Sequence, residues 1–375
     1  MFCQVKLLRI TLLVLFLAGS ATTAQARLKK AVPDIDVPQR EFVLAENLVR
    51  GKGQIHASTL EALKDGTVVC AAFMGRKEGH KDVNIVISRR SSEGWSPPET
   101  VTEKGRAHWN PVLFEVRPDD LFLMYKVGKS PINWVTMVRE STDHGLTWSK
   151  ERPLVPSDKR VGRGPVKNKP IRLESGRILA PGSMERVNWQ AFVDITDDDG
   201  LTWQQSNIIR ANNIPPGQEF GRGVIQPTLW QDDIRGDVHM LLRSTEGLIY
   251  KSDSQDEGKT WCPAYPLSVP NNNSGLDMVK NSQDGLLYLV CNPTTDISIG
   301  TRRTPLSLLF SRDNGKTWSK MLDLETGRGE FSYPAVVEEN GNLYISYTWK
   351  RLNIAYRHFT PRQLTKYRLL SQGTY

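Results

Sequence analysis

The sequence STDHGLTW at residues 141–148 returns three more times along the chain. It reads TDDDGLTW at 196–203, SQDEGKTW at 254–261 and SRDNGKTW at 311–318. The aspartate of each copy lies 55, 58 and then 57 residues after the one before it. A shorter copy, SEGW at 92–95, precedes the first. Regular recurrence of this kind identifies a repeat protein, in which each copy marks one structural unit.

Each residue type in the motif suits a tight turn between two β-strands. The Asp and the Ser or Thr bond nearby backbone amides, the Gly takes the positive φ that closes a hairpin, and the Trp packs between sheets. Alternating strand patterns precede the copies, as in LFLMY at 121–125 and SLLF at 307–310. Several short strands per period of roughly 50–60 residues are typical of propeller blades. Dividing the stretch from Arg40 to His358 by this period predicts an all-β, six-bladed β-propeller.

The motif resembles the Asp-box, or BNR repeat, of sialidases (neuraminidases) and their relatives. The resemblance covers nearly the whole chain after the first residues and is greatest to a subgroup called predicted neuraminidases. It implies that the Asp-boxes are structural and lie on the rim, away from a central site. It also implies that a strand from the start of the chain completes the last blade, and residues 41–45 are expected to supply it.

The N-terminus has the features of a secretory signal peptide. Lys6 and Arg9 precede an apolar run at 10–18, and Ala24 and Ala26 are the small residues that signal peptidase reads. We expect a signal peptide at 1–26, a lead-in at 27–40, the propeller at 41–360 and a C-terminal tail at 361–375. The mature protein should be secreted or periplasmic, with no membrane association after cleavage behind Ala26.

The composition of the chain limits the classes of ligand and cofactor that we expect. The net charge of +8 falls to +6 without Lys6 and Arg9, which suits an anionic carbohydrate and is equally explained by spread-out surface lysine. No nucleic-acid-binding module is recognisable. Cys70, Cys262 and Cys291 allow at most one disulfide, match no zinc spacing and are expected to be buried small hydrophobes. No metal or cofactor is expected.

The resemblance implies a site in which three arginines bind a substrate carboxylate, a Tyr–Glu pair acts as nucleophile and an Asp acts as general acid/base. Arg243 and Arg303 match the second and third arginines, with Arg302 as an alternative to Arg303. Tyr333 follows Arg303 by 30 residues and matches the nucleophile. Asp82 or Glu78, on an early loop, is expected to donate the proton. These two acids, Tyr333 and His56 are the candidate catalytic groups.

Two positions depart from the family pattern. His56 stands near the place of the first arginine, which is missing. Gln226, 17 residues before Arg243, stands where the family has the glutamate that assists the tyrosine. A glutamine can neither supply negative charge nor take a proton, so this substitution argues against ordinary sialidase chemistry.

Polar and aromatic residues recur between the Asp-boxes, where the innermost strand of each blade is expected to begin. Such residues bind sugar hydroxyls and carboxylates by hydrogen bonds and stack on sugar faces. The further candidates for substrate binding are His108, Asn110, Lys167, Lys169, Trp349 and Arg351.

Three functions remain open. The first is a glycoside hydrolase of sialidase type acting on an acidic glycan. The second is a polysaccharide lyase or unusual glycosidase on uronic acids, in which His56 is the base, Tyr333 the acid, and Lys167 and Lys169 neutralise the carboxylate. The third is a propeller that binds glycans without turning them over, because fold alone does not decide function.

Overall fold

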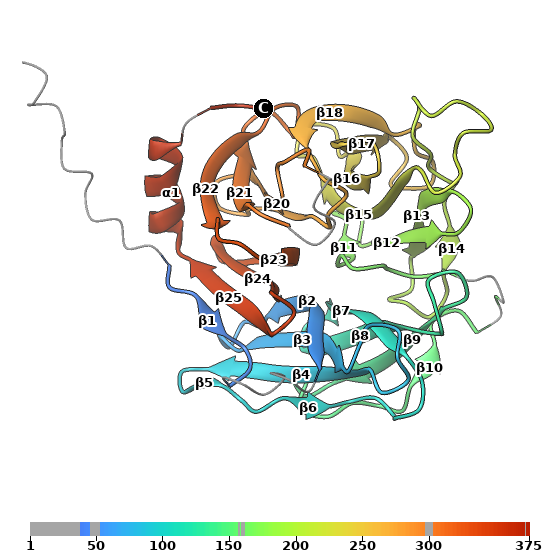
Figure 1. Cartoon of the computed structure of the whole chain (residues 1–375), viewed down its shortest axis with the longest axis vertical. Coiled ribbons are helices and arrows are strands. Elements are labelled where there is room, and N and C mark those ends of the chain that lie inside the picture. The colour runs from blue at the N-terminus through green and yellow to red at the C-terminus, as the bar shows by residue number, and fades with distance from the viewer. Residues whose placement is uncertain (1–37, 46–52, 157, 159–161, 297–302, 372) are drawn as a thin grey trace, which may run out of the picture. The chain divides into compact units, whose positions relative to one another are not determined.

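The computed structural model describes residues 38–45, 53–156, 158, 162–296, 303–371 and 373–375. The expected signal peptide, nearly all of the lead-in, and Arg302 lie outside these ranges. The described chain belongs to one compact unit, Pro38–Tyr375. Its strands form six sheets, which are the six blades that the repeat predicted (Figure 1).

The strands of the first three blades follow the chain. Blade 1 consists of β2 (Gln54–Ala62), β3 (Val68–Gly75), β4 (Asn84–Ser91), β5 (Gly94–Trp95) and β6 (Glu99–Thr100). Blade 2 consists of β7 (His108–Arg117), β8 (Asp120–Val127), β9 (Val135–Ser141) and β10 (Arg152–Pro153). Blade 3 consists of β11 (Ile171–Arg172), β12 (Ile178–Glu185), β13 (Trp189–Thr196) and β14 (Gln204–Gln205).

The last three blades repeat this antiparallel order, and the ring closes in the sixth. Blade 4 consists of β15 (Val224–Gln231), β16 (Val238–Ser244), β17 (Leu248–Ser254) and β18 (Tyr265–Pro270). Blade 5 consists of β19 (Asp277–Lys280), β20 (Leu287–Cys291), β21 (Leu306–Ser311) and β22 (Ser319–Glu325). Blade 6 consists of β23 (Phe331–Glu339), β24 (Asn342–Trp349), β25 (Asn353–Phe359) and β1 (Glu41–Phe42).

The pairing of β1 with β25 confirms the expected closure. Glu41 lies opposite Tyr356 and Phe42 opposite Ala355. The first described strand thus completes the last blade, so that this blade is held by both ends of the propeller sequence. The blades keep only short sheet edges, as is usual in propellers.

The Asp-boxes form the turns that their residue types predicted. In the third copy Asp256 accepts hydrogen bonds from the Thr260 backbone N–H at 2.8 Å and the Thr260 hydroxyl at 2.6 Å. Ser254 Oγ accepts from the Gly258 N–H at 2.9 Å, and Gly258 has a φ of +83°. The other three copies make the same bonds.

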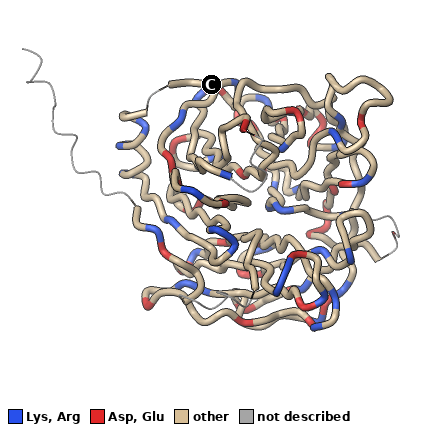
Figure 2. Tube along the Cα trace, viewed as in Figure 1, with Lys and Arg blue, Asp and Glu red and all other residues tan. Residues whose placement is uncertain are grey.

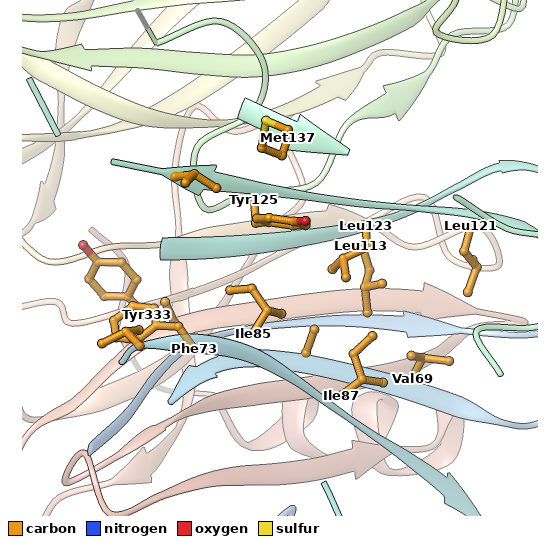
Figure 3. Packing of buried hydrophobic residues seen from close by; sticks show 14 of the residues in the cluster. Val69, Phe73, Ile85, Ile87, Leu113, Leu121, Leu123, Tyr125, Met137 and Tyr333 are labelled. Carbon is orange, nitrogen blue, oxygen red and sulfur yellow. The ribbon is translucent and has the colours of Figure 1, made fainter. Parts of the chain in front are cut away.

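The Asp-box tryptophans join each blade to the one before it. Trp261 of blade 4 packs in one core cluster with Val193 of blade 3, and Trp318 of blade 5 with Leu241 of blade 4. Figure 3 shows such a cluster at the boundary of blades 1 and 2, where Tyr333 lies at one end. The motif therefore stabilises the ring as well as each turn, through buried aromatic surface.

Register shifts recur in the innermost strands, which line the centre of the propeller. The innermost strands of blades 1, 4 and 6 shift register once each, and that of blade 2 shifts twice, the first time between Trp109 and Val112. Within these bulges Ala57, Asn110, Gln226 and Tyr333 have φ of 55°, 39°, 53° and 50°. Positive φ is costly for residues with a side chain and concentrates at functional sites. The bulges aim these side chains differently from the rest of each strand.

The segment after the last blade contains a helix that the sequence analysis did not predict. Helix α1 (Pro361–Leu370) begins with a capping box between Thr360 and Gln363 and buries Leu364. Beyond it, Tyr375 donates its backbone N–H to Trp318 O at 2.7 Å. The sequence carries the start signal of this helix, because Thr-Pro-x-Gln at 360–363 is a typical helix N-terminus.

Other expectations concern cysteines, membranes and charge. Cys70, Cys262 and Cys291 are free thiols, and burial raises the pKa of the Cys70 and Cys291 thiols. Among the described residues, no helix has the length and apolar character that a membrane span requires. Basic and acidic residues are interspersed along the described trace (Figure 2).

Candidate active site

The hydroxyl of Tyr333 is the focus of the site. It accepts hydrogen bonds from Gln226 Nε2 at 3.2 Å and from Arg243 Nη1 at 3.3 Å. Arg243 Nη1 also donates to Gln226 Oε1 at 3.1 Å, which fixes the orientation of the amide because arginine can only donate. In Figure 3 this hydroxyl points away from the apolar cluster that holds the ring. Two donors thus converge on the tyrosine oxygen.

His56, from the bulge of β2, packs against Tyr333. The ring centroids are 4.4 Å apart, and His56 Nδ1 is hydrogen-bonded to Thr348 Oγ1 at 2.7 Å. The Ala57 N–H donates to the same hydroxyl at 3.2 Å. Burial, and then the charges of the neighbouring arginines, lower the pKa of His56 well below 6.5. The imidazole is therefore neutral near pH 7 and is held in place through Nδ1.

Arg243 and Arg303 approach Tyr333 from blades 4 and 5. Arg243 Nε donates to Asn273 Oδ1 at 2.7 Å, and its guanidinium lies over the Trp189 ring at 5.3 Å. The Arg303 guanidinium lies 5.4 Å from the centroid of the Tyr333 ring. Within the described ranges, Arg303 Nη1 is buried without a hydrogen-bond partner. It forms a 3.6 Å ion pair with Glu330 Oε1, which is too long for a hydrogen bond, so its N–H can still donate to an anionic ligand.

Arg351 reaches the site from the last blade. Its Nε donates to Glu330 at 2.9 Å, and its Nη1 donates to Glu78 at 2.7 Å. Its backbone oxygen accepts from the Ile55 N–H at 3.0 Å, next to His56. Arg351 therefore lies beside His56, which stands near the place of the missing first arginine.

The two acids expected to donate a proton are in different environments. Asp82 bonds Arg76 Nε at 2.6 Å and His80 Nδ1 at 2.7 Å. The hydrogen bond from Arg76 is the main reason that the pKa of Asp82 falls to about 2. A carboxyl held ionised in this way does not donate a proton near neutral pH. Glu78 is ion-paired with Arg351.

The two candidate lysines are engaged within the protein. Lys167 Nζ donates to Asn168 Oδ1 at 2.6 Å, Leu276 O at 2.8 Å and Pro334 O at 2.5 Å, and burial lowers its pKa to about 7. Lys169 is ion-paired with Asp277 at 3.1 Å. These contacts join blade 3 to blades 5 and 6, so both side chains stabilise the packing of the blades around the centre.

Three further candidates are not joined to the Tyr333 group by any hydrogen bond in the described part of the chain. His108 Nδ1 is bonded to Val83 O at 2.8 Å, between blades 1 and 2. Trp349 packs against Phe42 of the outer strand β1, with centroids 5.0 Å apart. Asn110 occupies the bulge of β7, the counterpart of the Tyr333 position in blade 2.

Several residues that complete the site were missed by the sequence analysis. Asn273 lies in a polar run at 271–275, and Trp189, Thr348 and Glu330 gave no recognisable signal. Each is a common residue type whose importance depends on what another blade places beside it.

A cavity of about 780 Å³ lies elsewhere, between blades 4 and 5. Its charged groups are paired with one another, as in the His239 contacts with Asp232 at 3.0 Å and Asp253 at 2.5 Å. It contains none of the residues around Tyr333. Among the described residues, no group of His, Cys, Asp and Glu is placed to hold a metal ion.

Comparisons with known proteins agree with this architecture. A family model described as the BNR repeat-like domain matches residues 66–345. No curated protein matches the sequence significantly.

Solved structures resemble the fold at low sequence identity. A protein of unknown function from Dyadobacter fermentans is 16% identical with a TM-score of 0.68, over 86% of this chain and 98% of that one. A Hadza microbial sialidase is 17% identical with a TM-score of 0.67, over 82% of this chain and 66% of that one. The intramolecular trans-sialidase of Ruminococcus gnavus is 14% identical with a TM-score of 0.63, over 83% and 95%. The chain belongs to the BNR repeat-like family and has the six-bladed β-propeller fold of sialidases.

Proposed function

We propose that this protein is a secreted or periplasmic glycoside hydrolase of sialidase type that releases a carboxylate-bearing sugar from a glycan. The pair of guanidinium groups at Tyr333 carries the proposal. Arg243 donates to the tyrosine oxygen at 3.3 Å, and Arg303 lies over the ring with a buried Nη1 that makes no hydrogen bond to a described residue and only a 3.6 Å ion pair with Glu330. Guanidinium groups form strong, directional hydrogen bonds with carboxylates. A carboxylate bound to both would hold its sugar beside Tyr333.

The chemistry requires a nucleophile or charge stabiliser at the anomeric carbon. Tyr333 supplies the oxygen, and the two donors that converge on it stabilise negative charge there. His56 lies against the tyrosine ring and is neutral near pH 7, and in this proposal it is the group that takes the tyrosine proton. Thr348 holds this imidazole through Nδ1.

Gln226 then has a role that a glutamate would not have. A glutamate would accept the tyrosine O–H, whereas the Gln226 amide donates to the oxygen at 3.2 Å. In this scheme the missing base is replaced by His56, and Gln226 orients the tyrosine oxygen together with Arg243.

A lyase acting on uronic acids is the second candidate function. The neutral imidazole of His56 beside Tyr333 favours it, because a lyase needs a base and an acid in contact with one sugar. Lys167 and Lys169 are engaged inside the protein, so neutralising the carboxylate would fall to Arg243 and Arg303. A binding protein without catalysis would take up the same ligands and form no product.

Product analysis with a matched tyrosine variant tests the proposal. The substrates are the 4-methylumbelliferyl glycosides of N-acetylneuraminic acid and glucuronic acid, with the neutral galactoside as a control. We expect turnover of a carboxylate-bearing glycoside only, and a loss of about 10³-fold in kcat for Tyr333→Phe. The control is Tyr344→Phe, also in blade 6, where the Tyr344 ring stacks on His358.

Three results would contradict parts of this proposal. Full activity of Tyr333→Phe would remove the tyrosine from the mechanism. An unsaturated product that absorbs in the near ultraviolet would identify a lyase. Binding without turnover would leave a glycan-binding propeller.

A further inference from the structure

The hairpin of β12 and β13 brings a carboxyl group to the site. β12 ends at Glu185, which lies opposite Trp189 across the hairpin. The Trp189 ring packs 5.3 Å from the Arg243 guanidinium, and Arg243 donates to Tyr333 Oη at 3.3 Å. The backbone of Trp189 is fixed in turn by its N–H bond to Arg222 O at 3.0 Å. The hairpin thus holds Glu185 on the side of the site where Arg243 lies.

Two charged groups from other blades act on Glu185. They are Arg243 of blade 4 and Glu78 of the β3–β4 loop, and Glu78 is itself paired with Arg351. In the part of the chain that the structure describes, no hydrogen bond or ion pair engages the Glu185 carboxyl. Burial is the main reason that its pKa lies above 4.5.

This environment sets Glu185 apart from the two acids expected from the sequence. Asp82 is held ionised by Arg76, and Glu78 is committed to Arg351. A general acid must carry a proton at the working pH and must be free to release it. Among these three acids, only Glu185 has no hydrogen bond or ion pair with a described residue, and its pKa is moved upward, toward the protonated form.

We infer that Glu185 is the general acid/base of the reaction. This inference rests on the proposed hydrolase function. In the first step the Glu185 carboxyl proton passes to the glycosidic oxygen, which leaves the anomeric carbon with the bonding electron pair. Tyr333 Oη bonds to that carbon while the tyrosine proton passes to His56.

The second step restores every group. Water attacks the anomeric carbon and gives one proton to the Glu185 carboxylate. Tyr333 leaves with the electron pair of its bond and recovers its proton from His56. The products are the free sugar and the alcohol of the leaving group, and no further reactant is needed.

The first experiment compares leaving groups. Wild type and Glu185→Gln are assayed with the methyl and the 4-methylumbelliferyl glycosides of N-acetylneuraminic acid and glucuronic acid. The methyl glycosides need protonation, so we expect kcat/KM to fall about 10³-fold for them and less than about 10-fold for the activated aryl glycosides. Glu174→Gln, an exposed glutamate of the same blade, is the matched control and should match wild type.

The second experiment uses a readout that a merely structural role would not change. With Glu185→Ala and the aryl glycosides, added azide should restore turnover and give a glycosyl azide of retained configuration, because azide needs no general base. Thermal unfolding confirms that each variant is folded.

The outcomes separate the two proposals. A wild-type protein that cleaves none of the four glycosides refutes the hydrolase function and the inference with it. An active wild type with equal losses on both leaving groups in Glu185→Gln, or no azide product in Glu185→Ala, refutes Glu185 alone. The leaving-group signature in Glu78→Gln or Asp82→Asn would move the role to that residue and overturn the inference.

Discussion

Replacing Gln226 by glutamate tests how the tyrosine oxygen is used. The two side chains have the same shape, so the change replaces the donor at 3.2 Å from Tyr333 Oη by an acceptor and adds one negative charge. The new carboxylate keeps the position of Gln226 Oε1, 3.1 Å from Arg243 Nη1. It would therefore compete with the substrate carboxylate for the same guanidinium.

The size of the effect follows from the distances. A substrate carboxylate on the far side of the Arg243 guanidinium would lie about 5 Å from the new charge. At an effective dielectric constant of about 20, two like charges at that separation repel by about 3 kcal/mol. We therefore expect binding of a carboxylate ligand to weaken about 100-fold.

The assay is the KM for the carboxylate-bearing 4-methylumbelliferyl glycoside, together with the Kd of its free sugar acid by calorimetry. Gln255→Glu adds the same charge at an exposed turn of the same blade and is the control. An unchanged Kd would show that the carboxylate does not bind at Arg243. A higher kcat in Gln226→Glu would show that the tyrosine works with a carboxylate partner, which would refute the donor role.

The remaining predictions concern binding, acid–base chemistry and the ring. Arg303→Met removes the guanidinium over Tyr333, whose Nη1 makes no hydrogen bond to a described residue, and should raise KM for the acidic glycoside about 100-fold, with no effect on the melting temperature larger than a few degrees. Because burial and neighbouring arginines lower the pKa of His56, its neutral form persists as pH falls, and the acid limb of kcat/KM set by this group should lie below pH ~6.5. Thr348→Val removes the hydrogen bond to His56 Nδ1 and should lower kcat about 10-fold. If the acid limb of the pH profile does not move in this variant, Thr348 positions His56 without setting its pKa. Trp318→Ala should lower the free energy of unfolding, measured in urea, by about 3–5 kcal/mol, because Trp318 is buried between blades. Trp148→Ala, at a partly buried Asp-box tryptophan, is the control and should cost less. Equal losses in the two variants would contradict the role of Trp318 between blades.

The fold was predictable because its determinants are local. The Asp, Gly and Trp of each Asp-box act within eight consecutive residues, and the hydrogen bonds of one copy span only four positions. The turn chemistry therefore forms wherever the motif occurs, and its regular spacing gives the number of blades. The capping box of α1 is equally local and could have been predicted from Thr360 and Gln363.

The centre of the site was predictable only in part. Resemblance brought Tyr333, Arg243, Arg303, Gln226 and His56 to attention, and the structure places these five side chains together. Their donor and acceptor roles needed coordinates, because the direction of the Gln226 amide is set by Arg243 and by nothing in its own strand.

Other assignments depended on partners that the sequence does not reveal. Asp82 and Glu78 were equivalent acids in the sequence, but one is paired with Arg76 and the other with Arg351. Lys167 had the residue type of a ligand-binding group, but its ammonium is bonded to carbonyls of blades 5 and 6.

The sequence by itself determined the repeat and its turns, since both depend on short-range hydrogen bonding and on the pattern of apolar residues along strands. The closure of the ring by residues 41–45 was expected from the family resemblance, and it depends on long-range pairing such as that of Glu41 with Tyr356. The tertiary structure decided which side chains meet at the axis. Gln226 and Tyr333 are separated by 107 residues, and Glu78 and Arg351 by 273. At such separations, contact, burial and charge are set by how the blades assemble, and so the chemical role of each group is decided only in the closed propeller.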